Sequence, residues 1–409
     1  MNEAISVAPG AMSAPTPARF AGLEQIYAVV AAGAAVRDTE RTLPFDALDL
    51  LRQVRFSALR LPVSEGGGGG LLRDVMREAI RLGEADSNVA HIFRNHFVAV
   101  EQFLIGSTHE ACAPWRRAVL DGGIFSIAST ELDRPVTGGA LPVKTSLTAD
   151  GDGFRMNGTK YYSTGCLYAD LIVVRAMAPD NTATNVIIPS RRTGVELVDD
   201  WDGIGQRLTG TGTTNFHDVR VETKEVIFDR DTSRSLLSFT STIAQLFITA
   251  VIAGVIRAVL RDAKEMLKSR GRNFYFAPAA TPSDDPILQQ TIGRIAADTF
   301  AADLVVLAAA DRLDSVAMAR QNGESFDNIA HDAAATTAKA KVIVDELALR
   351  STNALFDVGG ASAATRQKNL DRHWRNARTL ASHNPASYKA QALGALELNG
   401  TRLPALGFF

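Results

Sequence analysis

The spacing of apolar residues changes twice along this chain. Between residues 21 and 123, apolar residues recur at the three- and four-residue intervals of amphipathic helices, as in VAHIFRNHFVAVEQFL. Between residues 124 and 230, short β-rich runs such as FSIAST and ADLIVVRAMA alternate with turn residues. From residue 231 to residue 409, long helical patterns rich in Ala, Leu and Val return. The chain is therefore predicted to be an α+β multidomain protein, with an N-terminal helical domain, a central β domain and a C-terminal helical domain.

Turn residues and unusually apolar helices refine this picture. The sequences ADGDG and MNGT predict turns between consecutive strands of the central domain. The helix expected over residues 290–315 is apolar on more than one face, so it needs neighbours on several sides. We therefore expect a C-terminal helical bundle that could be shared between subunits. The most apolar stretch, 244–260, is too short for a membrane span and carries Gln245 and Arg257, which predicts a buried helix.

Composition and charge limit the possible classes of function. A length of 409 residues exceeds what one compact core usually fills, so two or three packed units are expected. The chain has 46% hydrophobic residues, 22% charged residues and a net charge of −2, which indicates a soluble protein without a nucleic-acid partner. Cys112 and Cys166 cannot by themselves form a disulfide framework or a zinc site, and no metal site is expected. Residues 1–20 are rich in Ala, Pro and Ser and lack the features of a signal peptide, so we expect a disordered lead-in to a cytoplasmic protein with no membrane partner.

Two segments of the first half are candidates for ligand binding, each with a structural alternative. The run SEGGGGG (64–70) lacks the Lys-Ser/Thr ending of a phosphate-binding loop, so a flexible connection between helices explains it better. In FSIASTELDRP, Ser129, Thr130 and Glu131 end a predicted strand. Their hydroxyls and freed backbone groups could bind a flat polar ligand, or the residues could simply form a β-turn.

Two segments of the predicted β domain could approach a ring system. In NGTKYYSTGCLYAD, Tyr161 and Ser163 would share one face of a strand and Tyr162 would take the other. Small hydroxyls beside glycine suit a close approach of a ring to the backbone, although this signal alone is weak. The segment DDWDGIGQRLTGTGTTNF does not open a helix, so the dinucleotide-binding fingerprint does not apply. Its Trp201 could stack on a ring or lie in the core where two domains meet.

Two helical segments carry polar residues with more than one explanation. In HIFRNH, His91 and Asn95 lie four residues apart on one helical face, without a carboxylate or cysteine at metal-ligand spacing. They could line a site or be ordinary packed and surface residues. In SRGRNF, two arginines that include Arg272 end a predicted helix. They could bind phosphate oxygens or could merely interact favourably with the helix dipole.

The segment RNARTLASHNPASYKA near the end of the chain raises a sharper question. Arg375 and Arg378 lead into His383, and the following Asn-Pro stops the preceding helix. His383 could therefore handle a proton in an enzyme or could cap a helix end.

Taken together and in this order, these segments resemble the acyl-CoA dehydrogenase fold family from about residue 22 to the end of the chain. More closely, the chain resembles the branch of reduced-flavin-dependent monooxygenases that includes dibenzothiophene monooxygenase and related sulfur-acquisition oxidoreductases. The segments that carry the resemblance are HIFRNHF, NGTKYYSTG, DDWDGIGQR, TGTTNFHDVRV, SRGRNF and, above all, FDVGGASA followed by LDRHWRNARTLASHNPASYK. The resemblance implies an N-terminal helical domain, a central β-barrel-like domain and a C-terminal four-helix bundle. It also implies a homotetramer in which flavin, here FMN, lies between the β domain and helices of two subunits.

The resemblance also implies a change in chemistry. Dehydrogenases of this family abstract a proton with a glutamate, but residues 235–260 and 379–390, where that glutamate would lie, contain no Asp or Glu. His383 stands in the second of these segments instead. An imidazole that titrates near neutral pH could protonate or stabilise a flavin C4a-(hydro)peroxide, so His383 is the principal catalytic candidate. Ser163 and His91 are the further catalytic candidates, and His91 and Asn95 would line the substrate side together with His383.

The remaining roles concern the flavin. By position in the family, Ser163 would hydrogen-bond near flavin N5 or C4a, and Trp201 would pack on the isoalloxazine. Arg272 would contact the flavin phosphate from a neighbouring subunit. Ser129, Thr130 and Arg375 complete the expected cofactor-binding set. None of these residues is expected to bind a metal ion.

The function implied is that of a two-component, FMNH₂-dependent monooxygenase that uses O₂ and acts on a small organosulfur compound in sulfur acquisition. The sequence departs from dibenzothiophene monooxygenase at Asn95, where that enzyme has Tyr, near Ile127, where it has Asn, and at GASAA, where it has GARGT. These departures favour a sulfone, sulfinate or thioether over a polycyclic thiophene. A separate NAD(P)H:flavin reductase is expected as a partner, because no nicotinamide-binding unit is evident. The alternatives are an FAD-dependent acyl-CoA dehydrogenase, a monooxygenase acting on nitrogen or an aromatic carbon, and a non-catalytic helical scaffold.

Overall fold

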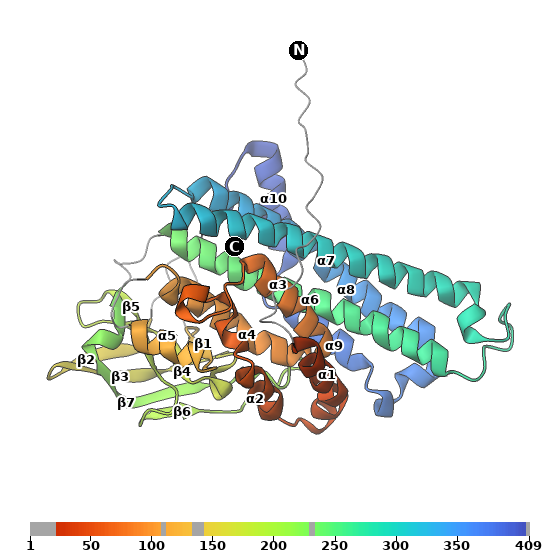
Figure 1. Ribbon diagram of the computed structural model, residues 1–409, viewed down its shortest axis with the longest axis horizontal. Helices are drawn as coiled ribbons and strands as arrows, with labels where there is room; N and C mark the ends of the chain where they lie inside the picture. Colours follow the sequence, from red (N-terminus) through yellow and green to blue (C-terminus); the bar gives the residue numbers. More distant parts are fainter. Residues whose placement is uncertain (1–21, 108–111, 133–142, 229–233, 406–409) are drawn as a thin grey trace, which may run out of the picture.

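The computed structural model describes residues 22–107, 112–132, 143–228 and 234–405 (Figure 1). The lead-in expected over residues 1–20 lies outside the described residues. Helices make up the first part of the chain, a sheet follows, and long helices make up the last part, in the predicted order. The first strand begins at Phe125 and the first long helix after the sheet begins at Arg234. The assignment of exact domain limits stays a prediction.

The described helices before the sheet contain nine to 18 residues and differ in how far they are buried. They are α1 (Leu23–Glu40), α2 (Phe45–Gln53), α3 (Leu72–Ala85), α4 (Ser87–Ala99) and α5 (Cys112–Leu120). In α3, Leu72, Val75, Met76 and Ala79 follow the helical period and are all buried. The glycine run before α3 does connect helical segments, as predicted, but it is packed rather than flexible. A Cβ atom at Gly67 would lie 2.3 Å from the carbonyl oxygen of Leu61.

The sheet is mixed and contains eight strands in the order β6-β7-β3-β2-β4-β5-β8, with β1 parallel to β4. The strands are β1 (Phe125–Ala128), β2 (Ser146–Asp150), β3 (Gly153–Lys160), β4 (Leu171–Met177), β5 (Ala183–Pro189), β6 (Val195–Leu197), β7 (Thr214–Glu222) and β8 (Val226–Phe228). The turn predicted at ADGDG is present, because β2 and β3 pair antiparallel from Asp150 to Gly153. The turn predicted at MNGT is wrong. These residues lie inside β3, where the register with β7 shifts between Met156 and Gly158.

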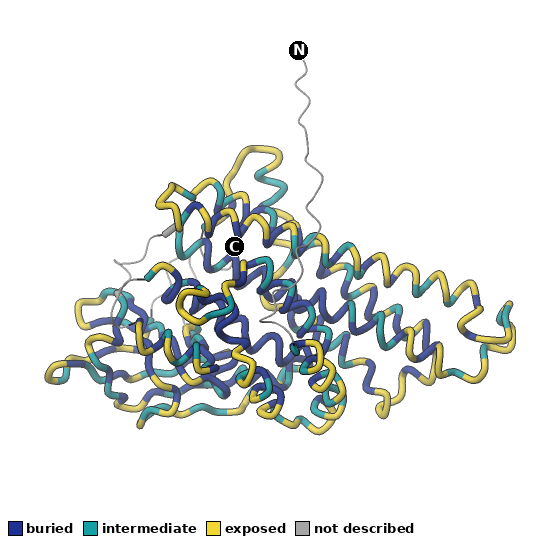
Figure 2. Tube along the Cα trace, viewed as in Figure 1, coloured by how far each residue is buried: buried dark blue, intermediate teal, exposed yellow. Residues whose placement is uncertain are grey.

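The C-terminal part is a bundle of long helices. They are α6 (Arg234–Ser269), α7 (Pro286–Gln321) and α8 (Asp327–Gly359), followed by the shorter α9 (Asp371–Ala381) and α10 (Ala386–Asn399). Helix α7 is apolar on more than one face, as predicted: Val306 and Leu313 are buried, whereas Phe300 and Leu304 are 69% and 56% exposed. Figure 2 shows that exposed residues recur along α7, on the outside of the bundle.

Helix α6 is the central element of the molecule. It packs against α3 and α4 on one side and against α7 and α8 on the other (Figure 1). Its segment Leu236–Ser269 is long and apolar enough to cross a membrane, but 83% of its most apolar window is buried inside the protein, which is the behaviour of a core helix. Gly83 and Gly254 let α3 and α6 approach closely, because a Cβ atom at Gly254 would lie 2.3 Å from the carbonyl oxygen of Ile80.

Candidate active site

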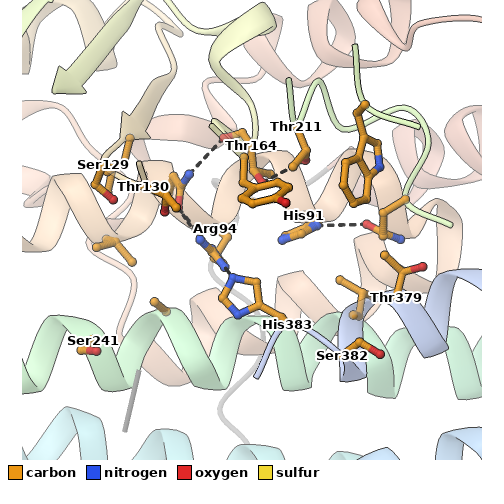
Figure 3. Close-up of a pocket in the computed structure, with 18 of the residues that line it drawn as sticks. His91, Arg94, Ser129, Thr130, Thr164, Thr211, Ser241, Thr379, Ser382 and His383 are labelled. Carbon is orange, nitrogen blue, oxygen red and sulfur yellow. Dashed lines mark hydrogen bonds between the residues drawn. The ribbon is translucent and has the colours of Figure 1, made fainter. Parts of the chain in front are cut away.

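A cavity of about 910 Å³ lies where α4, the end of β1, the loops around residues 162 and 201–211, α6 and the α9–α10 turn meet (Figure 3). This volume falls within the usual range for small-molecule and cofactor sites. Six of the predicted site residues line it: His91, Asn95, Ser129, Thr130, Trp201 and His383. The tertiary structure therefore brings together segments that lie as far apart as α4 and the α9–α10 turn.

Helix α4 presents three polar side chains to this cavity. The helix begins with Asp86 as its N-cap, whose carboxylate accepts a hydrogen bond from the Asn88 N–H at 2.9 Å. His91, Arg94 and Asn95 follow at i, i+3 and i+4, and all three line the cavity. The prediction that His91 and Asn95 share one face is confirmed. Arg94 was missed, although its spacing from His91 places it on the same face.

His91 is held by a residue that the sequence did not indicate. Its Nδ1 lies 3.1 Å from Oε1 of Gln206, and Nε2 of Gln206 donates to the Ser87 hydroxyl at 2.9 Å. The amide oxygen can only accept, so Nδ1 of His91 carries the proton. Nε2 of His91 is then an acceptor, and it is buried without a hydrogen-bond partner among the described residues. Burial, with the Arg94 cation adding to it, lowers the pKa of His91 to about 3, so the ring is neutral at pH 7.

His383 lies in the turn between α9 and α10. Its backbone contacts the end of α9, and its side chain lies in the cavity. Its backbone N–H donates to the carbonyl oxygen of Leu380 at 3.2 Å, which satisfies a carbonyl at the end of α9. Its side chain points into the cavity toward Arg94 and His91 (Figure 3). The two explanations considered from the sequence, a helix end and a position in a polar site, are therefore compatible.

Arg94 joins His383 to Asn95. An Nη1–H of Arg94 donates to Nε2 of His383 at 2.7 Å, and Nε and Nη2 donate to Oδ1 of Asn95 at 3.1 and 3.0 Å. A guanidinium has no acceptor, so Nε2 of His383 must be unprotonated and the neutral ring carries its proton on Nδ1. Asn95 in turn donates to the carbonyl oxygen of Thr164 at 3.0 Å. These bonds connect α4 to the α9–α10 turn and to the loop after β3.

The surroundings of His383 lower its pKa below the near-neutral value suggested from the sequence. Desolvation of the ring by the surrounding protein lowers its pKa well below the usual value, and the cations of Arg94 and Lys341 lower it further. His383 is accessible from the cavity, but none of the described lining residues carries a carboxylate that would favour the imidazolium. The ring is therefore neutral at pH 7, and any proton that it donates comes from Nδ1.

The loop after β3 differs from the predicted strand. Strand β3 ends at Lys160, Tyr161 makes only an isolated bridge with Thr130, and Tyr162 has a left-handed backbone with φ 55°. The predicted strand alternation of Tyr161, Tyr162 and Ser163 therefore does not apply. Instead, the N–H of Ser163 donates to the carbonyl oxygen of Gly212 at 3.1 Å, which ties this loop to the segment 209–212.

Ser163 lies behind the cavity wall rather than on it. It is 1% exposed and is not among the lining residues, whereas its neighbour Thr164 is. Apart from the weak Cys166 thiol, its hydroxyl has no hydrogen-bond partner among the described residues. A hydroxyl at this depth could reach a bound ring only after a small movement of the loop.

The indole of Trp201 forms part of the cavity wall. It packs edge-on against Tyr162, with ring centroids 6.2 Å apart, and its Nε1–H donates to the carbonyl oxygen of Gly205 at 3.3 Å. Of the two alternatives left open by the sequence, this position agrees with a ring that faces a site.

The two arginines expected to bind flavin do not reach the cavity of this chain. Arg375 is paired with Asp38 at 2.7 Å and with Asp371 at 2.8 Å, and it donates to the carbonyl oxygen of Ile204 at 3.2 Å. These contacts hold the 201–206 loop against α9, so its role here is to position that loop. Arg272 is exposed beyond the end of α6. A contact with the flavin of a neighbouring subunit stays a prediction.

Comparison with known proteins gives a consistent result. The family model described as "Acyl-CoA dehydrogenase, C-terminal domain" matches residues 246–388. The probable FMNH₂-dependent monooxygenase SfnC of Pseudomonas putida is 29% identical over 410 residues, which cover 97% of this chain and 100% of SfnC. Methanesulfinate monooxygenase MsuC from Pseudomonas fluorescens has a TM-score of 0.86 at 27% identity and covers 97% of this chain and 99% of its own. FMN-bound TdsC from Paenibacillus sp. A11-2 has a TM-score of 0.84 at 26% identity, with 94% and 98% covered.

Proposed function

We propose that this chain, which has the acyl-CoA dehydrogenase fold, is an FMNH₂-dependent monooxygenase, as SfnC is described to be and as the name of MsuC indicates for that monooxygenase. Its substrates are then O₂ and a small organosulfur compound, and its role is sulfur acquisition. The observation that carries this proposal is the cavity, where two neutral histidines and an arginine replace the carboxylate base of a dehydrogenase. None of its described lining residues is Asp or Glu, so the carboxylate base of those enzymes has no counterpart among them.

The residues present fit a bound FMN. The cavity volume of about 910 Å³ accommodates a tricyclic ring together with a small substrate. The Trp201 indole and the hydroxyls of Ser129, Thr130, Thr164 and Thr211 all line the cavity, and these groups suit the face and the polar edge of a flat ring. Reduced FMN, when bound, supplies the two electrons that activate O₂. We propose that Ser163, which lies behind the cavity wall, hydrogen-bonds near the reacting ring atoms once the loop after β3 moves slightly.

The two histidines divide the proton handling. The unpartnered Nε2 of His91 can accept a hydrogen bond from a group inside the cavity, and Gln206 keeps it in that state. His383 can donate from Nδ1 because Arg94 occupies its Nε2. We propose that His383 supplies or stabilises the proton at the oxygen that does not enter the substrate. Asn95 orients Arg94 and lines the substrate side.

The proposed function also includes a protein partner and an oligomeric state. A separate NAD(P)H:flavin reductase would supply FMNH₂, which is the dependence that the name of SfnC states for that protein. We also propose a cytoplasmic homotetramer in which Arg272 binds the flavin phosphate of a neighbouring subunit. Its support is the exposed apolar face of α7 and the exposed aromatic residues Phe274, Tyr275 and Phe276 that follow Arg272.

Stopped-flow oxidation of FMNH₂ tests the proposal. Anaerobic protein with FMNH₂ is mixed with oxygenated buffer, with and without methanesulfinate, for the wild type and for His383→Ala. The wild type should oxidise FMNH₂ at a rate different from that of free FMNH₂ and should couple it to product. His383→Ala should release more of the oxygen as H₂O₂. If FMNH₂ oxidises identically with and without protein, the monooxygenase proposal fails, and tightly bound FAD with acyl-CoA oxidation would support the dehydrogenase alternative.

A further inference from the structure

The charge of the cavity is one-sided. Its described lining residues include three arginines, Arg94, Arg175 and Arg378, and neither an aspartate nor a glutamate. Cavities lined by charges of one sign attract ligands of the other sign. FMN is itself an anion, so the question is which arginine faces a second anion.

Arg94 is the buried member of this set, and it has no ionic partner. It is 9% exposed, and its described partners are the neutral groups Asn95 and His383. No described carboxylate lies within ion-pair distance of it. Elsewhere, the same chain pairs a buried arginine in the usual way: Arg60, 7% exposed, lies 2.9 Å from the carboxylate of Glu101. A buried cation without a counter-ion is costly, and burial accordingly lowers the pKa of Arg94 to about 10.

The hydrogen bonds of Arg94 leave room for such a counter-ion. Of its five N–H groups, Nε, one on Nη1 and one on Nη2 are used in the described contacts. One N–H on each terminal nitrogen remains for a ligand, and two such donors can bind the oxygens of one oxyanion. Three fixed hydrogen bonds hold the guanidinium in place before any ligand arrives.

Resting on the proposed function, we propose that Arg94 binds the two oxygens of a small organic oxyanion, so that the substrate is a sulfinate rather than a neutral sulfone or thioether. The sulfur lone pair of a bound sulfinate stays free while Arg94 holds its oxygens. Oxygenation forms one S–O bond to give a sulfonate and breaks the O–O bond of O₂. The second oxygen atom leaves as water, with two electrons and two protons supplied by FMNH₂. His383 lies beside the bound oxyanion, because it shares Arg94.

Titration calorimetry with methanesulfonate, the unreactive sulfonate, tests this assignment without turnover. Binding is measured with and without FMN for the wild type, Arg94→Gln and the control Arg117→Gln, which removes one exposed charge on α5. We expect Arg94→Gln to weaken methanesulfonate binding roughly 10- to 100-fold, as for the loss of a charge-assisted bidentate contact. Its affinity for FMN should stay within about threefold of the wild type, and the control should match the wild type for both ligands.

Three results would overturn the assignment. The first is unchanged methanesulfonate binding by Arg94→Gln. The second is a loss of FMN affinity as large as the loss of methanesulfonate affinity, which would assign Arg94 to the flavin. The third is competition between FMN and methanesulfonate for the same site. If Arg94→Gln does not fold, Arg94→Lys keeps the charge, loses the paired donors and should weaken methanesulfonate binding by a smaller factor.

Turnover separates this assignment from the proposed function. The wild type should prefer methanesulfinate to dimethyl sulfone in kcat/KM, and Arg94→Lys should lose most of that preference. A wild type that prefers dimethyl sulfone refutes the sulfinate assignment alone. A wild type that binds methanesulfonate but oxidises no organosulfur compound refutes the monooxygenase function and leaves the anion site standing.

Discussion

Replacing Gln206 by Glu should raise the pKa of His91. Gln206 sits in a left-handed backbone conformation with φ 52°, where its N–H donates to Oδ1 of Asn376 at 2.7 Å and its side chain reaches His91. A glutamate has the same shape, so its carboxylate would lie where the amide lies, with Ser87 available to the other oxygen. The change therefore places a negative charge against Nδ1 of His91 and leaves the rest of the site intact.

The magnitude follows from the distance. Opposite unit charges about 4 Å apart attract by about 4 kcal/mol at an effective dielectric constant of about 20. One pKa unit corresponds to about 1.4 kcal/mol, so the shift should be about 3 units. The pKa of His91, about 3 in the wild type, should rise toward about 6. The proposed oxygenation should then slow as pH falls through about 6, because the imidazolium has lost the Nε2 acceptor.

The assay is NMR of protein labelled with ¹³C-histidine, recorded over pH 4 to 8. The chain has seven histidines, and the His91 signal is assigned by its loss in His91→Asn. In the wild type and in Gln206→Leu this signal should not titrate above pH 4, whereas in Gln206→Glu it should titrate near pH 6. A Gln206→Glu protein that is folded but shows no new titration would refute the pairing of His91 with Gln206.

Three further predictions concern stability, each measured as the free energy of unfolding in urea. Gly254→Ala should destabilise the protein by on the order of 1–3 kcal/mol, since its Cβ would clash with the Ile80 carbonyl oxygen 2.3 Å away. The control Gly293→Ala lies in α7 with nothing within 4 Å of the new Cβ, so it should stabilise the protein by about 1 kcal/mol. Equal effects of the two substitutions would contradict the close packing of α3 against α6. The pKa of Glu131 is lowered to about 2, because its hydrogen bonds and ion pair outweigh a burial effect in the opposite direction, so its contribution is present above pH 4.5 and disappears as pH falls through 2. The stability advantage of the wild type over Glu131→Gln should accordingly shrink from pH 6 to pH 2, and a constant difference would count against the buried pair. Burial lowers the pKa of Lys389 to about 7 from its usual 10.5, so the unfolded chain binds more protons than the folded protein between these pH values. Lys389→Met should therefore be more stable than the wild type at pH 7, and this advantage should vanish by about pH 10.5. If the variant has no such advantage at pH 7, Lys389 is not buried as a charge.

Patterns with a short range along the chain were predicted well. The helical period placed His91 and Asn95 on one face of α4, and both line the cavity. The alternation of β-rich runs with turn residues located the sheet between two helical parts. The turn predicted at MNGT was wrong, because this sequence accommodates a bulge in β3 as readily as a turn. Local sequence states which conformations are allowed, and pairing with β7 selected one of them.

The roles suggested by family position were partly reassigned by neighbours that the sequence does not show. Arg375 was expected beside flavin, but Asp38, 337 residues away, pairs with it and directs it to the 201–206 loop. Ser163 was expected to hydrogen-bond near flavin N5 or C4a, but it is 1% exposed and lies behind the cavity wall. A charged or polar side chain takes the partner that folding supplies, which depends on contacts between distant segments.

The sequence by itself therefore determined the order of elements, the apolar character of the central helix and the lack of a carboxylate base, since these depend only on residue types and their spacing. Tertiary structure alone decided the state of the site. It brought His383 to within 2.7 Å of Arg94, 289 residues earlier, and it excluded water from His91 and Arg94. The protonation of these groups follows from desolvation and from the charges around them, and both exist only once the chain is packed.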